Sequence, residues 1–321
     1  MKEIYFAGGC FWGVEHFFKG VDGVVNTTPG YANGRTENPS YEQVYTDTTG
    51  FAETVRVEYN PEKVSLQQLT RLFFAIIDPE SLNRQGHDEG SRYRTGIFYT
   101  ADADRQAVKE VFDRIPGKVV TELEPLRNFY PAEEYHADYL DKNPQGYCHL
   151  PLKAFRYLRL YQDLKLVLAD ETDEIARMAQ ISAYIQERMG FFWTGFYRVR
   201  ADFSTPATPS LEMTKLSSRP SEARGEILIL GPFQGPPACM RIRYGKGVCG
   251  TAWKEKRTLV VADVEDFPGH IACSAESRSE IVVPVIREGE VKAVLDIDSK
   301  ELGSFDRIDA AFLEMIVDDC A

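Results

Sequence analysis

The first half of the chain alternates two hydrophobic patterns, one typical of strands and one typical of helices. Strand-like segments are short apolar runs or alternate polar and apolar residues, whereas helix-like segments repeat apolar residues every three or four positions. The strand-like segments are 3–9, 53–61 and 94–100, and the helix-like segments are 66–77 and 102–115. This mixture predicts an α/β (α+β) fold for the first half.

The second half begins with a helical pattern and continues mainly with strand-like segments. An apolar stripe over 171–189 has helical spacing and ends at Gly190; its members are Ile175, Met178, Ser182, Ile185 and Met189. The strand-like segments are 226–233, 258–264, 279–286 and 292–299, and a last helix-like segment covers 305–319. We therefore divide the chain into a first domain, 1–156, and a second domain, 157–321.

Three long segments lack either pattern. Segments 30–50 and 78–93 are rich in Gly, Asn, Pro and Tyr, and loops of this length in a compact domain are usually functional. Segment 202–225 is rich in Ser, Pro and Thr, which predicts a mobile loop inserted into the second domain.

Charge and hydropathy narrow the class of protein. The net charge of -12 and the absence of a basic cluster argue against a nucleic-acid partner or an anionic membrane surface. The longest purely apolar run, 72–77, is too short to cross a bilayer, and charged residues and glycines interrupt any signal-peptide core at the N-terminus. We expect a cytoplasmic protein that binds no membrane.

Six cysteines stand far apart, at positions 10, 148, 239, 249, 273 and 320. This spacing is too sparse for a disulfide-stapled secreted scaffold and holds no Cys-x-x-Cys pair. His270 and Cys273 are three residues apart, yet four ligands with ordinary zinc spacing do not gather near them, so we expect no metal site.

Cys10 lies between a glycine pair and two aromatic residues, at the predicted start of a helix. The free N–H groups and the positive end of the dipole at a helix N-terminus favour a thiolate, which is the nucleophilic form. Gly8 and Gly9 would let a substrate approach the backbone closely. The alternative from this segment alone is a buried structural cysteine.

Five segments in order link the first half to a known family: GGCFWG, NPSYEQV, TGFAETVRVEYNP, DEGSRYRTGIFY and KNPQGYC. Residues 1 to about 153 resemble peptide methionine sulfoxide reductase A. The resemblance implies an α/β sandwich that reduces the S epimer of methionine sulfoxide, free or within oxidised proteins. Cys10 then matches the family's nucleophile.

The remaining site residues of the first half follow from the same resemblance. A thiolate that attacks a sulfoxide sulfur needs a proton donor for the oxygen, and Glu53 matches the family's acid if apolar neighbours such as Phe51 keep it protonated. The resemblance implies that two hydroxyls hold the oxygen, two aromatics cage the methyl group and one polar residue orders the site. These are Tyr41 and Tyr93, Phe11 and Trp12, and Asp88. Singly, each could be an ordinary strand, loop or core residue.

Turnover needs a second thiol. The first thiol becomes a sulfenic acid as methionine leaves, and another thiol must condense with it to a disulfide. Cys148 matches the family's resolving cysteine. No further cysteine follows it closely, so the resemblance implies that thioredoxin reduces the disulfide directly.

Residues from about 157 onward resemble a second, unrelated family, the free methionine-R-sulfoxide reductases, which have a GAF-type α/β fold. The segments are LADETDEIA, WTGFY, LGPFQGPPACMRI, GKGVCGTA, FPGHIAC, SEIVVPV and VLDIDS. By this resemblance Cys273 is the nucleophile, Cys239 the resolving cysteine and Cys249 a third cysteine of variable role. The implied substrate-binding residues are the carboxylates Glu280, Asp296 and Asp298 and the aromatic cage Trp193 and Tyr197.

Asp296 and Asp298 lie two apart in a strand-like segment, so both face one side, while Leu295 and Ile297 face the core. Adjacent acids disfavour joint ionisation, and one then keeps the proton that a sulfoxide oxygen needs. Read alone, DIDS also fits a polar strand end or a magnesium site.

These observations predict a bifunctional methionine sulfoxide reductase that needs no metal or organic cofactor. Its expected partners are free methionine sulfoxide, oxidised proteins and thioredoxin. The alternative for the second half is a redox or ligand sensor, because folds of the GAF type also bind small molecules without turning them over.

Overall fold

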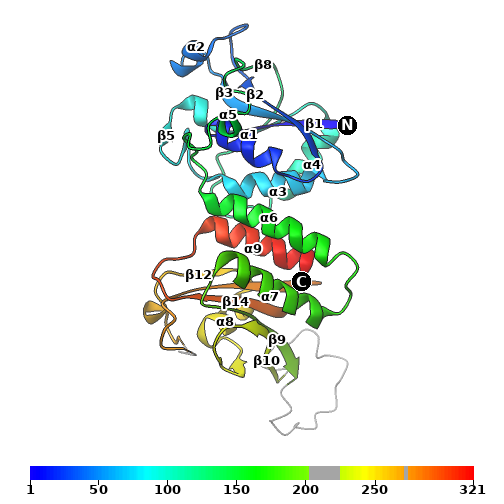
Figure 1. Cartoon of the computed structure of the whole chain (residues 1–321), viewed down its shortest axis with the longest axis vertical. Helices are drawn as coiled ribbons and strands as arrows, with labels where there is room; N and C mark the ends of the chain where they lie inside the picture. Colours follow the sequence, from blue (N-terminus) through cyan, green and yellow to red (C-terminus); the bar gives the residue numbers. More distant parts are fainter. Residues whose placement is uncertain (202–224, 271–273) are drawn as a thin grey trace. The chain divides into compact units, whose positions relative to one another are not determined.

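The protein is described by a computed structural model that covers residues 1–201, 225–270 and 274–321. The chain forms two compact units, Met1–Leu158 and Arg159–Ala321. The boundary between them falls inside helix α6 (Leu152–Val167). Each unit contains one six-stranded sheet with helices, which confirms the predicted α/β fold class (Figure 1).

The sheet of the first unit has the strand order β7-β6-β1-β3-β2-β8. All neighbours are antiparallel except β6 and β7. The strands are β1 (Lys2–Gly8), β2 (Val24–Ala32), β3 (Ala52–Tyr59), β6 (Thr95–Tyr99), β7 (Glu122–Pro125) and β8 (Phe129–Pro131). Glu53 of β3 therefore pairs with Tyr31 of β2.

Helices and short turns complete the first unit. They are α1 (Phe11–Lys19), α2 (Tyr41–Tyr45), α3 (Leu66–Ile76), α4 (Asp102–Phe112), α5 (Tyr139–Lys142), the 3₁₀ helix η1 (Ser91–Tyr93) and the hairpin β4 (Arg84–Gln85) with β5 (Asp88–Glu89). Phe6 of β1 stacks on Phe18 of α1 and on Phe73 of α3, with 4.7 Å between ring centroids in both pairs. Each of these fully buried rings contributes about 1.5–3 kcal/mol to folding, so this stack fixes both helices on β1.

Two helices of this unit begin with the same local signal. Ser40 and Ser65 accept hydrogen bonds from the N–H groups of Gln43 and Gln68, whose side chains bond back to the serine backbone. Such reciprocal capping satisfies two of the free N–H groups at a helix start. The cap at Ser40 starts α2 inside the long segment 30–50 and places Tyr41 in the first turn of the helix.

The sheet of the second unit is antiparallel throughout, in the order β11-β10-β9-β14-β13-β12. Its elements are α7 (Glu174–Met189), β9 (Trp193–Ala201), β10 (Glu226–Gln234), β11 (Arg241–Arg243), α8 (Gly247–Glu255), β12 (Leu259–Val261), the 3₁₀ helix η4 (Val264–Asp266), β13 (Ser279–Arg287), β14 (Glu290–Ser299) and α9 (Arg307–Cys320). Figure 1 shows α7 and α9 on one face of this sheet and α8 on the other.

The expected strands and helices are present, with some differences in detail. Helix α7 ends at Gly190 as predicted, and its φ of 73° suits glycine. The buried face of the helix differs from the predicted stripe: it includes Ile181, whereas Ile175 and Met189 are more exposed. Strand β2 was not expected because Pro29 interrupts its apolar pattern. Helices α5, α6 and α8 were also not expected. The predicted mobile loop 202–225 lies, apart from residue 225, outside the described residues.

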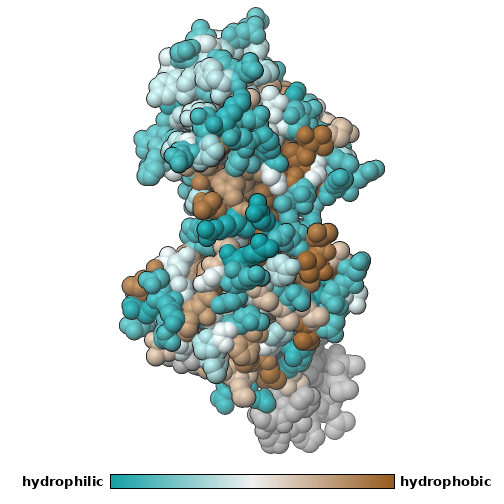
Figure 2. All heavy atoms as spheres, in the orientation of Figure 1, coloured by the Kyte–Doolittle hydropathy of each residue, from teal (hydrophilic) through white to brown (hydrophobic). Residues whose placement is uncertain are grey.

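The described helices do not include one that combines the length and apolar character of a membrane span. Figure 2 shows hydrophilic residues over most of the face in view, with hydrophobic residues in separate small patches. Single exposed apolar residues of this kind are normal on protein surfaces.

Candidate active sites

Cys10 occupies the N-cap position of α1, as the sequence predicts, and is only 6% exposed. Gly9 before it has a φ of +85°, and a Cβ there would lie 2.7 Å from the Cβ of Gln85, so this turn requires glycine. Burial raises the pKa of the Cys10 thiol well above its usual value, and the Glu53 carboxylate raises it further. The expected thiolate is therefore not the resting form, because desolvation outweighs the backbone N–H of Trp12, which lowers the pKa.

Glu53 lies on β3 and is 1% exposed. Its Oε2 accepts a hydrogen bond of 3.1 Å from the backbone N–H of Phe11, in the first turn of the helix that begins after Cys10. Burial raises the pKa of Glu53 to about 8, although the Phe11 N–H and the Arg92 guanidinium both oppose the rise. A carboxyl group with this pKa is mostly protonated at pH 7 and is a proton donor.

Tyr41 and Tyr93 approach the same carboxyl group from two different loops. Tyr41 begins α2, and burial followed by the charge of Glu53 raises its pKa to about 12. Tyr93 ends η1, is 8% exposed and has its pKa raised by the same two effects. The Cys10 sulfur adds to both shifts, so the structure brings the two hydroxyls, Glu53 and Cys10 into one site, with both hydroxyls protonated.

Phe11 and Trp12 form an aromatic wall next to Cys10. Phe11 is 1% exposed, whereas Trp12 is partly exposed and stacks on Tyr139 with 3.7 Å between centroids. The Trp12 Nε1–H donates to Nδ1 of His136 at 3.1 Å, and the His136 ring lies 5.0 Å from Phe11 and 4.6 Å from Tyr41. The buried His136 thus fixes the indole against the rest of the site.

Sequence reasoning missed four residues that hold this site in place. Glu133 accepts from the hydroxyl of Tyr31 at 2.7 Å and from the backbone N–H of Tyr41 at 2.8 Å. Asp47 binds the guanidinium and the backbone N–H of Arg92, whose side chain covers the Tyr93 ring at 4.4 Å. The missed residues are His136, Glu133, Asp47 and Arg92. Asp47 and Arg92 lie in the long segments 30–50 and 78–93, which carry predicted site residues, whereas Glu133 and His136 had no such signal.

Asp88 and Cys148 complete the first site. Asp88 lies on β5, and its negative charge raises the pKa values of Cys10, Glu53 and Cys148. Cys148 is partly buried, carries a free thiol and lies against α1, where a Cβ on Gly13 would be 3.1 Å from its sulfur. An ionised Cys148 would raise the pKa of Cys10, so the two thiols lie within electrostatic reach of each other.

A cluster of buried acids around one thiol marks the second unit. Glu280 on β13 pairs with Asp298 on β14, and Asp296 lies two positions before Asp298. Leu295 and Ile297 are fully buried, as expected for the opposite side of the strand. The Cys249 thiol, on the other side of the cluster, donates to Oε1 of Glu280 at 4.0 Å.

Burial and neighbouring acids dominate the pKa values of these groups. Burial raises the pKa values of Glu280 and Asp296 well above their usual range, and the neighbouring carboxylates raise them further. Burial raises the pKa of Asp298 to about 6 and that of the Cys249 thiol well above its usual value. Oδ1 of Asp296 is buried and has no hydrogen-bond partner among the described residues. The cluster therefore holds protons at pH 7 and presents one open acceptor.

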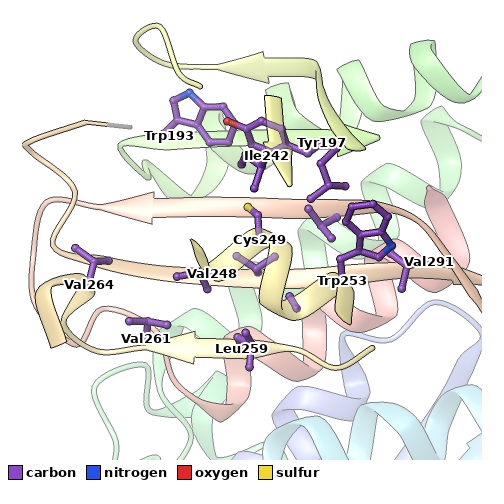
Figure 3. Close-up of a cluster of buried hydrophobic side chains, with 14 residues drawn as sticks. Trp193, Tyr197, Ile242, Val248, Cys249, Trp253, Leu259, Val261, Val264 and Val291 are labelled. Atoms are coloured by element: carbon purple, nitrogen blue, oxygen red, sulfur yellow. The ribbon is translucent and has the colours of Figure 1, made fainter. Parts of the chain in front are cut away.

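Two adjoining pockets share Ser277, Asp296 and Asp298. The pocket over Cys249 encloses about 380 Å³ of empty space, including its open mouth, and the second encloses about 260 Å³. The predicted aromatic cage, Trp193 and Tyr197, lines the second pocket, and its centroids are 5.9 Å apart. Figure 3 shows Cys249 amid the buried cluster that these aromatics share.

The other cysteines of the second unit have different environments. Cys239 is partly buried against the Trp193 cluster, and its sulfur is in a disulfide. Cys273, the predicted nucleophile, lies outside the described residues. Cys320 is buried on α9.

Three of these groups have metal-binding chemistry. One ligand atom each of Cys249, Glu280 and Asp296 lies within 4.8 Å of the others. A cation there would have to displace the protons that burial retains on all three. The arrangement as it stands favours donation of protons to an oxygen atom.

Comparison with known proteins assigns both halves of the chain. Residues 2–164 match the peptide methionine sulfoxide reductase family, and residues 216–321 match the GAF domain family. The peptide methionine sulfoxide reductase MsrA of Clostridium acetobutylicum is 54% identical over 155 residues, which make up 47% of this chain and 96% of that protein.

Two solved structures are similar to one half each. The reduced form of Mxr1 from Saccharomyces cerevisiae is 44% identical, covers 46% of this chain and 88% of its own, and has a TM-score of 0.44. Free methionine-R-sulfoxide reductase from Neisseria meningitidis, in complex with its substrate, is 41% identical, covers 51% of this chain and 84% of its own, and has a TM-score of 0.43.

The first family match contains every residue that builds the Cys10 site, from Cys10 itself to Cys148. The match spans half of this chain, and the Clostridium protein is covered almost completely. The chain therefore belongs to the peptide methionine sulfoxide reductase family and carries a GAF domain in its second half.

Proposed function

We propose that the first unit of this methionine sulfoxide reductase acts on the S epimer, free or within proteins, with Cys10 as nucleophile and Glu53 as proton donor. The observation that carries the proposal is the pairing of a buried carboxyl group, with a pKa of about 8, with the helix start at Cys10. A donor that is protonated at neutral pH is what the sulfoxide oxygen requires as negative charge builds on it.

The groups around Cys10 have complementary roles in this step. The Cys10 sulfur attacks the sulfoxide sulfur while Glu53 gives a proton to the oxygen, which the protonated Tyr41 and Tyr93 hydroxyls also bind. The oxygen, with the proton from Glu53, ends on Cys10 as a sulfenic acid, Glu53 takes up the proton that the thiol loses, and methionine leaves reduced. Phe11 and Trp12 would hold the S-methyl group. A protonated Glu53 also no longer raises the pKa of Cys10 through its charge.

Cys148 would then displace the oxygen from the Cys10 sulfenic acid as water, which leaves a disulfide between the two residues. Its free thiol, close to Cys10 beside Gly13, supports this role. Thioredoxin would return both thiols to the reduced form by disulfide exchange.

The second unit, in this proposal, reduces the free R epimer with Cys273 as nucleophile and Cys239 as resolving cysteine. Support comes from the GAF match, from the sequence resemblance and from the protonated acid cluster of Glu280 and Asp296. Asp296 and Asp298 line both pockets, so a substrate bound there would contact the acid cluster directly.

Racemic substrates test both assignments on the whole chain. With thioredoxin, thioredoxin reductase and NADPH, free methionine sulfoxide should be converted almost completely, because each unit takes one epimer. Racemic sulfoxide within an unfolded peptide should stop at about half, since only the first unit accepts peptides and a stereospecific site fixes the line of attack. Free substrate that also stops at half would make the second unit a binding module rather than an enzyme.

A further inference from the structure

His149 follows Cys148 directly, and both side chains lie on one surface of α1. A Cβ on Gly13 would be 3.1 Å from the Cys148 sulfur and also 3.1 Å from Nδ1 of His149. The thiol and the imidazole therefore both border the space that the missing Gly13 side chain leaves free, although no hydrogen bond joins them at rest. The sequence pattern assigned His149 no role.

The hydrogen bonds of His149 define which ring nitrogen is free. Nε2 lies 3.0 Å from the carbonyl oxygen of Gly8, at the end of β1. A carbonyl only accepts, so Nε2 carries the proton and the neutral ring has its lone pair on Nδ1. In the described part of the chain this Nδ1 is buried and has no hydrogen-bond partner.

The surroundings keep the ring neutral at pH 7. Burial lowers the pKa of His149, while the Asp88 carboxylate and the Gly8 carbonyl act in the opposite direction. The groups around the ring are the Cys148 thiol, the aliphatic part of the Gln85 side chain, the Asp88 carboxylate and the carbonyl at the end of β1. A neutral imidazole with an unpaired, buried lone pair is a base that is ready to accept a proton.

We propose that His149 is the general base of the second chemical step, in which Cys148 forms the disulfide with Cys10. The proposal rests on the assignment of Cys148 as the resolving cysteine. Nδ1 takes the proton from the Cys148 thiol as its sulfur attacks the Cys10 sulfur, so the S–S bond forms and the S–O bond breaks. The Cys148 sulfur is oxidised and the Cys10 sulfur is reduced, and the leaving hydroxide takes the proton from the imidazolium to become water.

The need for a base follows from the environment of Cys148. Burial and the charge of Asp88 raise its pKa, so few Cys148 thiols ionise unaided at neutral pH. The attacking species is the thiolate. A base on the next residue removes this limitation without a permanent charge in the site.

The test compares two steps of a single turnover in His149→Gln. The glutamine amide still donates to the Gly8 carbonyl but offers no base. We expect methionine release to keep its rate, disulfide formation to slow about 100-fold, and the Cys10 sulfenic acid to accumulate, as mass spectrometry of a dimedone-trapped sample would show. His87→Gln, which removes an exposed imidazole from the β4–β5 turn, is the matched control and should change neither rate.

The pH profile separates a base from a purely structural role. In the natural protein disulfide formation should be constant above about pH 7 and slow below the pKa of His149. In His149→Gln it should instead rise about tenfold per pH unit as Cys148 ionises by itself. Disulfide formation at the natural rate, or a variant profile that stays constant, would overturn the proposal.

Two further variants keep the outcomes distinct. His149→Asn repeats the test with a shorter side chain, and loss of methionine release in both variants would assign His149 a structural role and overturn the proposal. Cys148→Ser checks the assumption that Cys148 is the resolving cysteine. If a Cys10 disulfide still forms at the natural rate in this variant, that assignment fails.

Discussion

In the first unit a single carboxyl group stands beside the candidate nucleophile, whereas in the second unit three carboxyl groups surround one thiol. Glu53 keeps its proton because burial outweighs two neighbours that favour ionisation. Burial also dominates the raised pKa values of Glu280 and Asp296, and the Asp298 carboxylate raises both further, while hydrogen bonds to Cys249 and Glu280 oppose the rise at Asp296. In the proposed function the first site would therefore use one donor, whereas the second would have two.

The largest expected effect removes each nucleophile separately. Cys10→Ser should abolish reduction of the S epimer and leave turnover of the free R epimer near normal, because each site has its own thiol. Cys273→Ser should do the reverse, so that racemic free substrate stops at about half conversion. Chiral chromatography of the remaining sulfoxide measures both results. Retained S turnover in Cys10→Ser would remove Cys10 from its role.

Substitution of the acids should affect the two sites unequally. Glu53→Gln is expected to slow single-turnover methionine release by about two to four orders of magnitude, the usual range for a lost general acid. Asp296→Asn should slow R turnover by only about tenfold, because Glu280 remains as a protonated donor. Stopped-flow kinetics with each pure epimer compare the two variants with the natural protein. Equal losses at both sites would contradict the idea of a shared donor in the second unit.

The pH dependence of the first site should report Glu53. Its pKa of about 8 means that the donor is protonated at pH 7 and loses its proton as pH rises. Methionine release should therefore be constant up to about pH 7 and fall about tenfold per unit above pH 8. Glu53→Gln cannot lose that proton, so its slow rate should lack this fall. A fall of the same size in both proteins would assign the titration to another group.

The smallest expected effect is on stability. An unfolded chain ionises its carboxyl groups near pH 4, whereas the folded cluster keeps its protons, so folding stability decreases as pH rises from 4 through the raised pKa values. Asp296→Asn removes part of this loss and should raise the Tm of the second unit more at pH 8 than at pH 5. A rise of a few degrees is expected, since 1 kcal/mol corresponds to about 2–4 °C for such a domain.

Differential scanning calorimetry of the whole chain at both pH values measures this effect. Asp170→Asn, at an exposed position of the same unit, is the control and should leave the Tm unchanged. A lower Tm for Asp296→Asn at pH 8 would mean that the buried carboxyl group stabilises the fold.

The sequence predicted the regular elements well because their patterns are local. Apolar periodicity located α3 and α4, and Gly190 marked the end of α7. Strand β2 escaped because its identity depends on pairing with β3, and Pro29 hides its pattern. A local periodicity does not reveal which strands pair when they are distant in sequence.

For the candidate site, family motifs supplied residues such as Glu53 but not the network behind them. His136 and Glu133 contact the site across more than 90 residues of sequence, through Trp12 and Tyr41. The helix start favours ionisation of Cys10, but its burial, a tertiary property that local sequence does not reveal, acts against this and raises the pKa of the thiol.

The buried, neutral Cys10 thiol has a consequence for survival of the protein under oxidants. Peroxides and alkylating reagents react with thiolates, so a thiol that is 6% exposed and protonated at rest reacts slowly with them. Only a molecule that packs against the aromatic wall and accepts the Glu53 proton would react readily with the Cys10 thiol. The same oxidising conditions that create the substrate would therefore leave the unoccupied site largely intact.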